Sequence, residues 1–425
     1  MESIKPSSPT PDHLKSFKLS LPDQLAPPTY NSLSETLILF YPLGGTIKGD
    51  VSVDLSYEAV TFTEAQASIQ LSDILRNPEM DILQQFLPFD PYNVRSDKPV
   101  AVLAIQVTIL VCGGLAIGVC ISHKTADGAT LASFLCAWAL TARRASESIA
   151  DSLFDMATLF PPSDHLHVIM PSGLFSKQKI VTKRFVFDAT SLATLKGRAA
   201  KATCMNNPTP IEAITALLCK SAMNSTSEKS GKATLPRIKS HLPGLAFGNL
   251  WRNAIASIAD GYNKIELPDI VVQLRTAMRK INEEYVRKLQ GDDGLSQAIE
   301  SLKEVSEMVT KGQVEFYRFS SWPMWVCTSN APIKNVVILM GMRSGDGTEG
   351  WVSMDEQHMT KSEREEQLLM HFRPNHIACD SNIGSTPLEA YVYSKSSSRS
   401  VSKSSMLRIY CPCSEIYRDH LSLKP

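Results

Sequence analysis

A histidine and an aspartate lie four residues apart in the segment Ser122 to Gly128, which reads SHKTADG and follows an apolar run. Imidazole accepts a proton near neutral pH, so His123 is a candidate general base. Asp127 has three candidate roles: binding a cation with His123, capping a helix that begins at Gly128, or fixing the turn that aims His123. We favour the third role, because no third ligand lies at a useful spacing for a metal.

The segments on either side of this histidine indicate how it is positioned. Residues 115–121 are apolar throughout, which predicts a central strand buried on both faces. An apolar stripe at helical spacing follows, formed by Leu131, Phe134, Leu135 and Trp138. Ligands bind at the carboxyl ends of strands in α/β sheets, and a helix N-terminus there favours neutral imidazole. From residue type alone, a histidine satisfied inside the core remains the commoner interpretation.

Length, charge and cysteine content bound the class of protein. A chain of 425 residues exceeds one hydrophobic core, so we expect two domains. Lys plus Arg equals Asp plus Glu, at 43 each, which leaves no long-range field to attract nucleic acid or an acidic membrane surface. The nine cysteines are scattered without zinc spacing. This pattern is typical of reduced thiols in a cytoplasmic protein without a structural metal.

One stretch, residues 100–121, is apolar enough to imitate a membrane span. It is rich in β-branched residues, and Gly113-Gly114 interrupts its middle. Two strands joined by a two-residue turn explain this composition better than a helix does. We therefore predict a hairpin here and no membrane span.

The rest of the chain divides by composition. A proline-containing stretch at 161–180 is the candidate crossover between a first domain at 1–160 and a second at 181–372. Residues 269–289 are predicted to form one long amphipathic helix. Residues 373–425 contain a segment rich in serine, lysine and arginine without clear periodicity, and we expect them to form a poorly ordered tail.

The His123 region closely resembles the HxxxD region of the BAHD acyltransferases, plant enzymes that move an acyl group from coenzyme A to an alcohol or amine. HxxxD alone is a weak signal, but here the preceding strand and the following glycine match as well. The resemblance extends over about Ile4 to Phe372. Other matching segments follow in the family's order: Leu25–Pro28, Phe40–Leu43, Val181–Phe185, Phe247–Asn249, Phe319–Trp322 and Gly345–Gly347.

The resemblance implies an α/β fold with a two-domain chloramphenicol acetyltransferase-like architecture, each domain a mixed β-sheet flanked by helices. It implies that His123 takes the proton from an acceptor hydroxyl and later protonates the thiolate of CoA. Acyl-CoA is then a co-substrate, with acetyl-CoA the usual donor, and no bound cofactor is needed. The match is best to the vinorine synthase-like branch, which acylates alkaloid and terpenoid alcohols. We expect a monomer whose partners are these small molecules.

The resemblance also assigns residues that support the site. The family's counterpart of Asp127 points away from the substrate and pairs with an arginine. Arg275 matches that arginine best, and Arg279 is the alternative. Gly128 completes the supporting set, directly after the HxxxD segment. A solvated helix face is the plain alternative for both arginines.

Four residues are assigned to acyl-CoA by the same resemblance. Gly248 and Asn249 match a loop near the CoA channel, and an ordinary turn is the alternative interpretation. Ser320 and Ser321 match a strand end that lines the cleft.

The chain departs from the family's pattern in three places. The second signature, DFGWG, is absent, because the segment ending at Trp322 runs almost directly into Trp325. A strand expected near Tyr30 is missing, and the tail after Phe372 is atypical. Losing a core strand costs several kcal/mol, which is comparable to the margin of about 5–15 kcal/mol by which domains are stable. An alternative hypothesis is therefore a catalytically impaired or inactive truncated family member.

Overall fold

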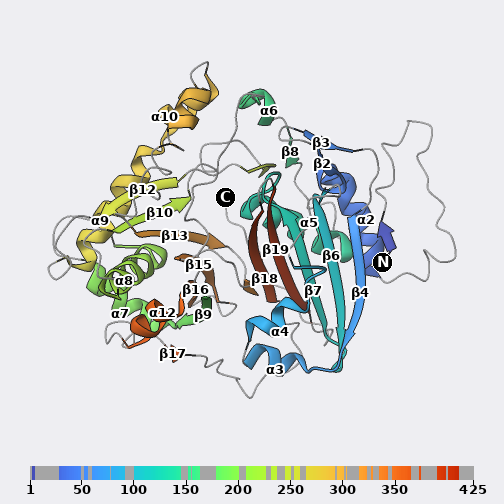
Figure 1. Ribbon diagram of the computed structural model, residues 1–425, viewed down its shortest axis with the longest axis horizontal. Helices are drawn as coiled ribbons and strands as arrows, with labels where there is room; N and C mark the ends of the chain where they lie inside the picture. The colour runs from blue at the N-terminus through green and yellow to red at the C-terminus, as the bar shows by residue number, and fades with distance from the viewer. Residues whose placement is uncertain are drawn as a thin grey trace.

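Two β-sheets stand side by side in the computed structural model, each with helices packed against it (Figure 1). The structure describes residues 2–4, 28–48, 52–55, 60–76, 78–90, 100–144, 152–154, 156–162, 179–200, 207–225, 231–236, 245–249, 253–258, 265–291, 294–300, 303, 315–322, 327–328, 335–342, 347–364, 373–374, 390–398 and 401–410.

The first sheet carries the candidate base. Its central pair is the antiparallel hairpin of β6 (Leu103–Leu110) and β7 (Leu115–Ser122). Strand β4 (Val60–Ala67) runs parallel to β6, so the sheet is mixed. The full order is β1 (Glu2–Ile4), β4, β6, β7, β19 (Val401–Tyr410), β14 (Cys327–Thr328) and β18 (Ala390–Ser398).

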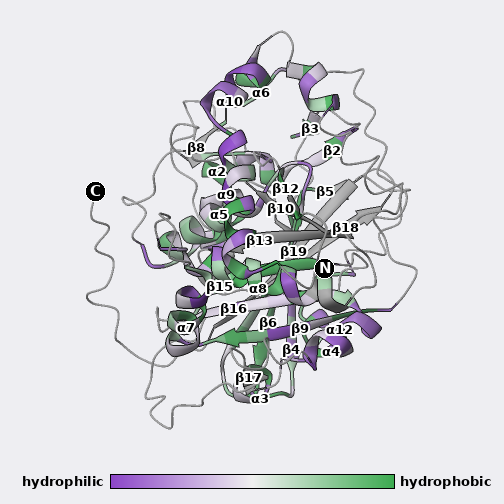
Figure 2. Ribbon diagram, turned by 90° about the vertical axis from the view of Figure 1, so that its left-hand side faces the viewer, coloured by the Kyte–Doolittle hydropathy of each residue, from purple (hydrophilic) through white to green (hydrophobic). Residues whose placement is uncertain are grey.

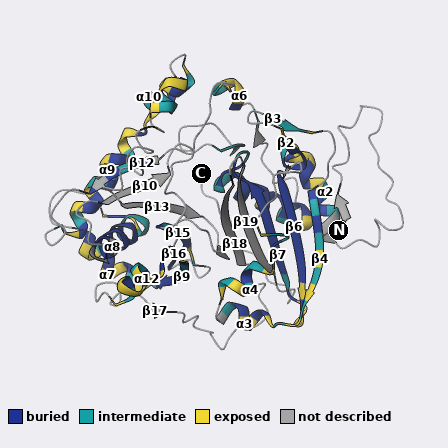
Figure 3. Ribbon diagram, in the orientation of Figure 1, coloured by how far each residue is buried: buried dark blue, intermediate teal, exposed yellow. Residues whose placement is uncertain are grey.

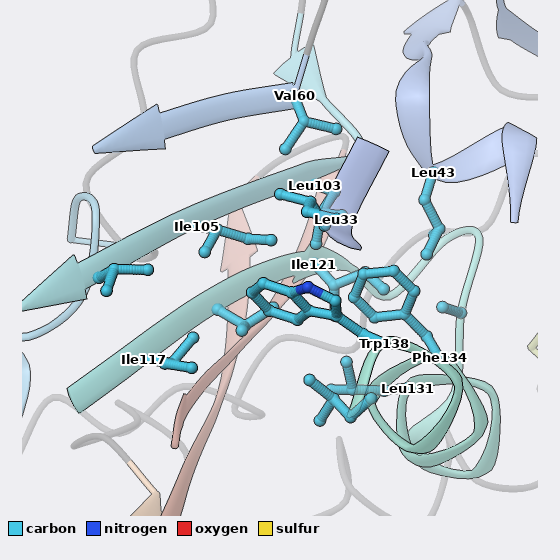
Figure 4. Packing of buried hydrophobic residues seen from close by; sticks show 14 of the residues in the cluster. Leu33, Leu43, Val60, Leu103, Ile105, Ile117, Ile121, Leu131, Phe134 and Trp138 are labelled. Atoms are coloured by element: carbon cyan, nitrogen blue, oxygen red, sulfur yellow. The ribbon is translucent and has the colours of Figure 1, made fainter. Parts of the chain in front are cut away.

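One face of the first sheet is covered by α2 (Pro28–Leu39) and α5 (Gly128–Ala142). Figure 4 shows Leu131, Phe134 and Trp138 of α5 gathered against the strand side chains. These residues belong to the stripe whose spacing predicts a helix after residue 128, and the helix is confirmed. The indole N–H of Trp138 donates to the Ser32 hydroxyl at 3.0 Å, which ties α5 to α2.

The opposite face of the sheet is covered by α3 (Leu71–Arg76), α4 (Met80–Gln84) and residues 85–90 (Figure 1). Gln106 donates from its side chain to the carbonyl of Gln85 at 3.0 Å. Gly118 permits this close approach, because a Cβ built there would lie 1.9 Å from the carbonyl oxygen of Phe86. Strand β7 is thus buried on both faces, as its apolar sequence predicts (Figure 3).

The second sheet is also mixed, with β13 parallel to β15 and β15 antiparallel to β16. Its order is β12 (Asn253–Ile258), β10 (Gly231–Pro236), β13 (Glu315–Trp322), β15 (Val336–Gly341), β16 (Thr348–Asp355), β9 (Ile180–Phe187) and β17 (Arg373–Pro374). The helices around it are α7 (Ala189–Ala199), α8 (Pro210–Ser225), α9 (Leu267–Lys280), α10 (Glu283–Gln290) and α12 (Glu356–Glu363).

The two sheets share packing. Ile338, Met340 and Trp351 of the second sheet belong to the same buried cluster as the core of the first sheet. A short parallel pair, β8 (Ser152–Leu153) and β11 (Leu245–Ala246), also joins the two halves of the chain. Smaller elements are η1 (Tyr41–Gly44), β2 (Thr46–Lys48), β3 (Ser52–Asp54), β5 (Val100–Ala101) and α6 (Met156–Leu159).

Two sequence expectations are refined by these elements. The apolar stretch does form a hairpin, but its loop is Val111–Gly114 rather than the two glycines alone, and Gly113 has φ of +77°. Among the described residues, no helix is long and apolar enough to cross a membrane. The predicted helix over 269–289 is two helices, because Asn282 caps α10 through its side chain and ends the run. The hydrophilic character of α10 is visible in Figure 2.

Two further expectations concern the tail, residues 373–425, and the crossover, residues 161–180. We expected residues 373–425 to be poorly ordered, whereas the structure contains β17, β18 and β19 in this range. Composition did not predict these strands because their pairing is made by the main chain. The edge of β7 offers N–H and C=O groups that an extended segment can pair with, whatever its side chains are. Most of the expected crossover, 161–180, lies outside the described residues.

Candidate active site

His123 directly follows the last residue of β7 and is 6% exposed. The strand end is anchored because the N–H of Ser122 donates to the carbonyl of Val102 at 2.8 Å. The chain then turns sharply, since the N–H groups of Thr125 and Ala126 both donate to the carbonyl of Ser122 at 3.2 Å. The hydroxyl of Thr125 donates to the same carbonyl at 3.0 Å. The backbone around His123 is therefore closely held.

Asp127 lies at the start of α5 and is 8% exposed. Its carboxylate accepts the N–H of Thr130 at 2.8 Å, and its backbone is extended, with φ of −90° and ψ of −179°. This is the geometry of a helix N-cap, and Gly128 is the first residue of the helix. Among the described residues, no group of three or more His, Cys, Asp or Glu side chains is arranged to hold a metal ion.

Residues 246–249 come from the second half of the chain and lie against this turn. The carbonyl of Gly248 accepts the N–H of Asp127 at 3.1 Å and the hydroxyl of Thr130 at 2.9 Å. The N–H of Gly248 returns a bond to the Thr130 hydroxyl at 3.1 Å. Gly248 has φ of +141°, a conformation that side chains rarely adopt, so glycine is needed here.

Asn249 makes the most direct contact with the candidate base. Its side-chain Nδ2 donates to the main-chain oxygen of His123 at 2.6 Å. The structure thus brings Gly248 and Asn249, which the family resemblance assigns to the CoA channel, onto the turn that holds His123 and Asp127. Sequence reasoning missed the contact between Asn249 and His123 because these two residues are 126 positions apart. A Gly-Asn pair in a sequence indicates only a local turn.

The assignment of Arg275 as the partner of Asp127 stays a prediction, and the bonds described between Arg275 and other side chains are to α8. Arg275 is on α9, at the outer edge of the second half and away from α5 (Figure 1). Its Nε and Nη2 donate to the two carboxylate oxygens of Glu212 on α8, at 2.7 and 2.8 Å. The carboxylate raises the pKa of Arg275. These bonds from Arg275 to Glu212 join α9 to α8.

The remaining assigned residues are placed by backbone alone. Ser320 and Ser321 lie near the end of β13, where they pair in register with Ile338 and Leu339 of β15. Their side chains, and the residues just after Trp322 where the DFGWG signature is missing, lie outside the described part of the structure.

The geometry described so far is that of a buried histidine at the carboxyl end of a central strand, followed at once by a capped helix. Such an arrangement suits proton transfer, because an imidazole whose backbone is fixed can be presented to a reactant in one orientation. The surrounding main chain is held by bonds from both halves of the molecule.

Comparison with known proteins identifies the family. A family model described as Transferase family matches residues 30–369, more than half of the chain. Limonoid 7-O-acetyltransferase from Citrus sinensis is 34% identical, with 87% of this chain and 96% of the relative aligned. Stemmadenine O-acetyltransferase from Catharanthus roseus is 33% identical over 84% of this chain and 94% of the relative. Vinorine synthase from Rauvolfia serpentina is 32% identical over 84% and 94%.

Solved structures agree on the fold. The crystal structure of vinorine synthase matches with a TM-score of 0.71 at 29% identity, covering 88% of this chain and 97% of that chain. The structure of F. sporotrichioides TRI101, complexed with coenzyme A and T-2, matches with a TM-score of 0.61 at 12% identity over 82% and 91%. The latter likeness concerns the fold alone. Together they confirm the expected α/β architecture of two mixed sheets flanked by helices.

The alignments also bear on the missing segments. The alignment with the citrus protein runs over 442 positions while using only 87% of this 425-residue chain, so part of the relative has no counterpart here. The likeness nevertheless covers most of both chains, in sequence and in fold. The chain therefore belongs to the BAHD family of acyl-CoA-dependent O-acyltransferases.

Proposed function

We propose that the chain transfers an acetyl group from acetyl-CoA to a hydroxyl of a plant alkaloid or terpenoid alcohol, with His123 as the general base. The observation that carries this proposal is the placement of His123, buried at the end of the central strand β7 and held in a turn braced from both halves. The names of the relatives support the substrate class, since they acetylate limonoids and stemmadenine.

The reaction proceeds in two proton-coupled steps. His123 removes the proton from the acceptor hydroxyl as its oxygen attacks the thioester carbonyl. The tetrahedral intermediate then collapses, the carbon–sulfur bond breaks, and the imidazolium returns the proton to the CoA thiolate. The products are the ester and free CoA, so no further reactant is required. General-base assistance supplies about 10²- to 10⁴-fold, and positioning supplies much of the rest.

Supporting roles are assigned to the neighbours of His123. Asp127 and Gly128 fix the start of α5, and so the direction in which the turn presents His123. Gly248, Ser320 and Ser321 are proposed to lie along the path of acyl-CoA, as the family resemblance implies. In this proposal acyl-CoA is a co-substrate and no cofactor stays bound between turnovers.

The test is the release of CoA thiol from acetyl-CoA in the presence of a limonoid or indole alkaloid alcohol. We expect His123→Ala to lower kcat by at least about 100-fold, in keeping with loss of a general base. His358→Ala is the matched control, because His358 lies on α12 and pairs with Asp355 of the second sheet. If His123→Ala released CoA as fast as the parent chain, the assigned role of His123 would be wrong.

A second candidate is a chain that retains the fold but has lost activity. The missing DFGWG signature and the unmatched part of the relatives favour it. Titration calorimetry with acetyl-CoA separates the two candidates. Binding without turnover of any alcohol would support the impaired chain, whereas turnover that depends on His123 would exclude it.

The chain is also proposed to act as a cytoplasmic monomer that needs only its two small-molecule substrates and binds neither membrane nor nucleic acid. The thiols of Cys120 and Cys219 are buried, which suits a reducing compartment. Light scattering after gel filtration tests the oligomeric state, and a mass near twice 46.8 kDa would contradict it.

A further inference from the structure

We infer that Asn249 is a positioning residue for the general base, acting through the main chain of His123; the inference rests on the proposed role of His123. The contact is the hydrogen bond from Asn249 Nδ2 to the carbonyl oxygen of His123, at 2.6 Å. That bond restrains the peptide plane that follows His123. The direction of the Cα–Cβ bond of His123, and so the position of its imidazole, depends on that plane.

The donor itself is held rigidly. Strand β11 pairs with β8 immediately before this segment, and Phe247 is buried with its ring centroid 5.1 Å from that of Phe154. Gly248 then bonds to both Asp127 and Thr130 of the first half. The residues just before Asn249 are therefore held in place by contacts on both sides, and Asn249 donates to His123 from this fixed position.

The other end of the same amide is unsatisfied. Asn249 Oδ1 is buried and, within the part of the chain that the structure describes, has no hydrogen-bond partner, which is unfavourable for stability. Turning the amide over would place this oxygen against the carbonyl oxygen of His123, so the observed orientation is the one that makes the bond. An apolar side chain of similar shape would not leave that buried oxygen unpaired. The gain from an asparagine here lies in its hold on His123.

Two near-isosteric replacements test this role. Asn249→Asp exchanges the donor for an oxygen that repels the His123 carbonyl, and Asn249→Leu removes polarity altogether. The matched control is Asn282→Asp, because the side chain of Asn282 accepts the N–H of Tyr285 at 2.9 Å to cap α10, and an aspartate keeps that cap. Thermal melting of each variant shows whether the fold is retained.

We expect both Asn249 variants to lower kcat by about 10- to 100-fold, because small displacements of a catalytic group cost rates of this size. KM for acetyl-CoA and for the alcohol stays within about two-fold if binding is untouched. Asn282→Asp leaves both constants unchanged. A rise in KM with kcat preserved would overturn the inference and make Asn249 a binding residue.

A second readout does not need turnover. In protein labelled with ¹⁵N-histidine, the ring signals of His123 are assigned by their absence in His123→Ala. We expect these signals to shift in both Asn249 variants and to stay in place in Asn282→Asp. In a preparation without turnover this spectrum decides, and unchanged His123 signals overturn the inference.

The two proposals fail in different ways. Unchanged CoA release by His123→Ala removes the general base, and the role of Asn249 falls with it. Loss of activity in His123→Ala together with parent-like kcat in Asn249→Asp removes the role of Asn249 alone, whatever the spectrum shows.

Discussion

The carboxylate of Asp127 accepts the main-chain N–H of Thr130 at 2.8 Å, so the aspartate of the HxxxD segment caps the helix behind the candidate base. We expect Asp127→Ala to lower the free energy of unfolding by about 0.5–2 kcal/mol, the usual cost of a lost N-cap. Asp127→Asn keeps a capping oxygen and is the control. Urea unfolding monitored by circular dichroism measures both. If Asn were as damaging as Ala, the charge rather than the cap would be the source of the effect.

Gly118 and Gly197 form a second pair of predictions, because the same substitution has opposite expected effects. A Cβ on Gly118 would lie 1.9 Å from the oxygen of Phe86, so Gly118→Ala forces the 85–90 segment away from β7 and costs about 1–3 kcal/mol or more. Gly197 is inside α7, where an added Cβ would meet no described atom within 4 Å beyond the adjacent residues and the helix's own backbone. Gly197→Ala should stabilise the chain by about 0.5–1 kcal/mol. Melting temperatures that move in the same direction would contradict this account.

Arg184 and Glu349 form a buried ion pair between β9 and β16, with side chains 5% and 4% exposed. The Nε of Arg184 donates to Glu349 Oε2 at 2.8 Å, and Nη2 donates to the other oxygen. Glu349→Gln leaves a buried guanidinium short of its counter-charge, at a cost of about 3–5 kcal/mol. The double variant Arg184→Met with Glu349→Leu should recover much of that loss. Chemical unfolding of the three chains measures the difference, and a double variant no more stable than the single one would refute it.

Glu212 gives a prediction about pH. Burial raises its pKa, but hydrogen bonds from Arg275 and Thr209 outweigh burial and hold the pKa below its ordinary value of 4.5. A carboxyl whose pKa is lower in the folded state stabilises the fold above its unfolded pKa, and that contribution is lost as the pH falls through the folded value. Glu212→Gln should therefore lose about 1–3 kcal/mol at pH 7. The gap should narrow below pH 4.5, and a gap that widened in acid would contradict the assignment.

The central hairpin of the first sheet and the helix that follows it could be predicted from local patterns. Gly113-Gly114 between β-branched runs indicated the hairpin, and the α5 stripe follows from its helical period. Both signals come from residues close together in the chain. Because one signal precedes His123 and the other follows it, together they indicated that His123 lies at a strand end.

The misses come from contacts between distant segments. The bonds from Arg275 to Glu212 link residues 63 positions apart, and no local pattern indicated them. The bond from Asn249 to His123 depends on how two halves of the chain meet, which no local pattern encodes. The break between α9 and α10 occurs where the side chain of Asn282 caps α10. In the sequence, this one capping residue is a weaker signal than the apolar periodicity that continues across it.

Ile338, Met340 and Trp351 share a buried cluster with the first sheet, and this affects how the molecule unfolds. If either half unfolded alone, these side chains would be exposed to water while the other half kept an open cavity, and both changes are unfavourable. The two halves should consequently melt together, in one cooperative transition. Heat capacity measured across that transition would then report on the whole molecule, and a substitution in either sheet would move the same peak.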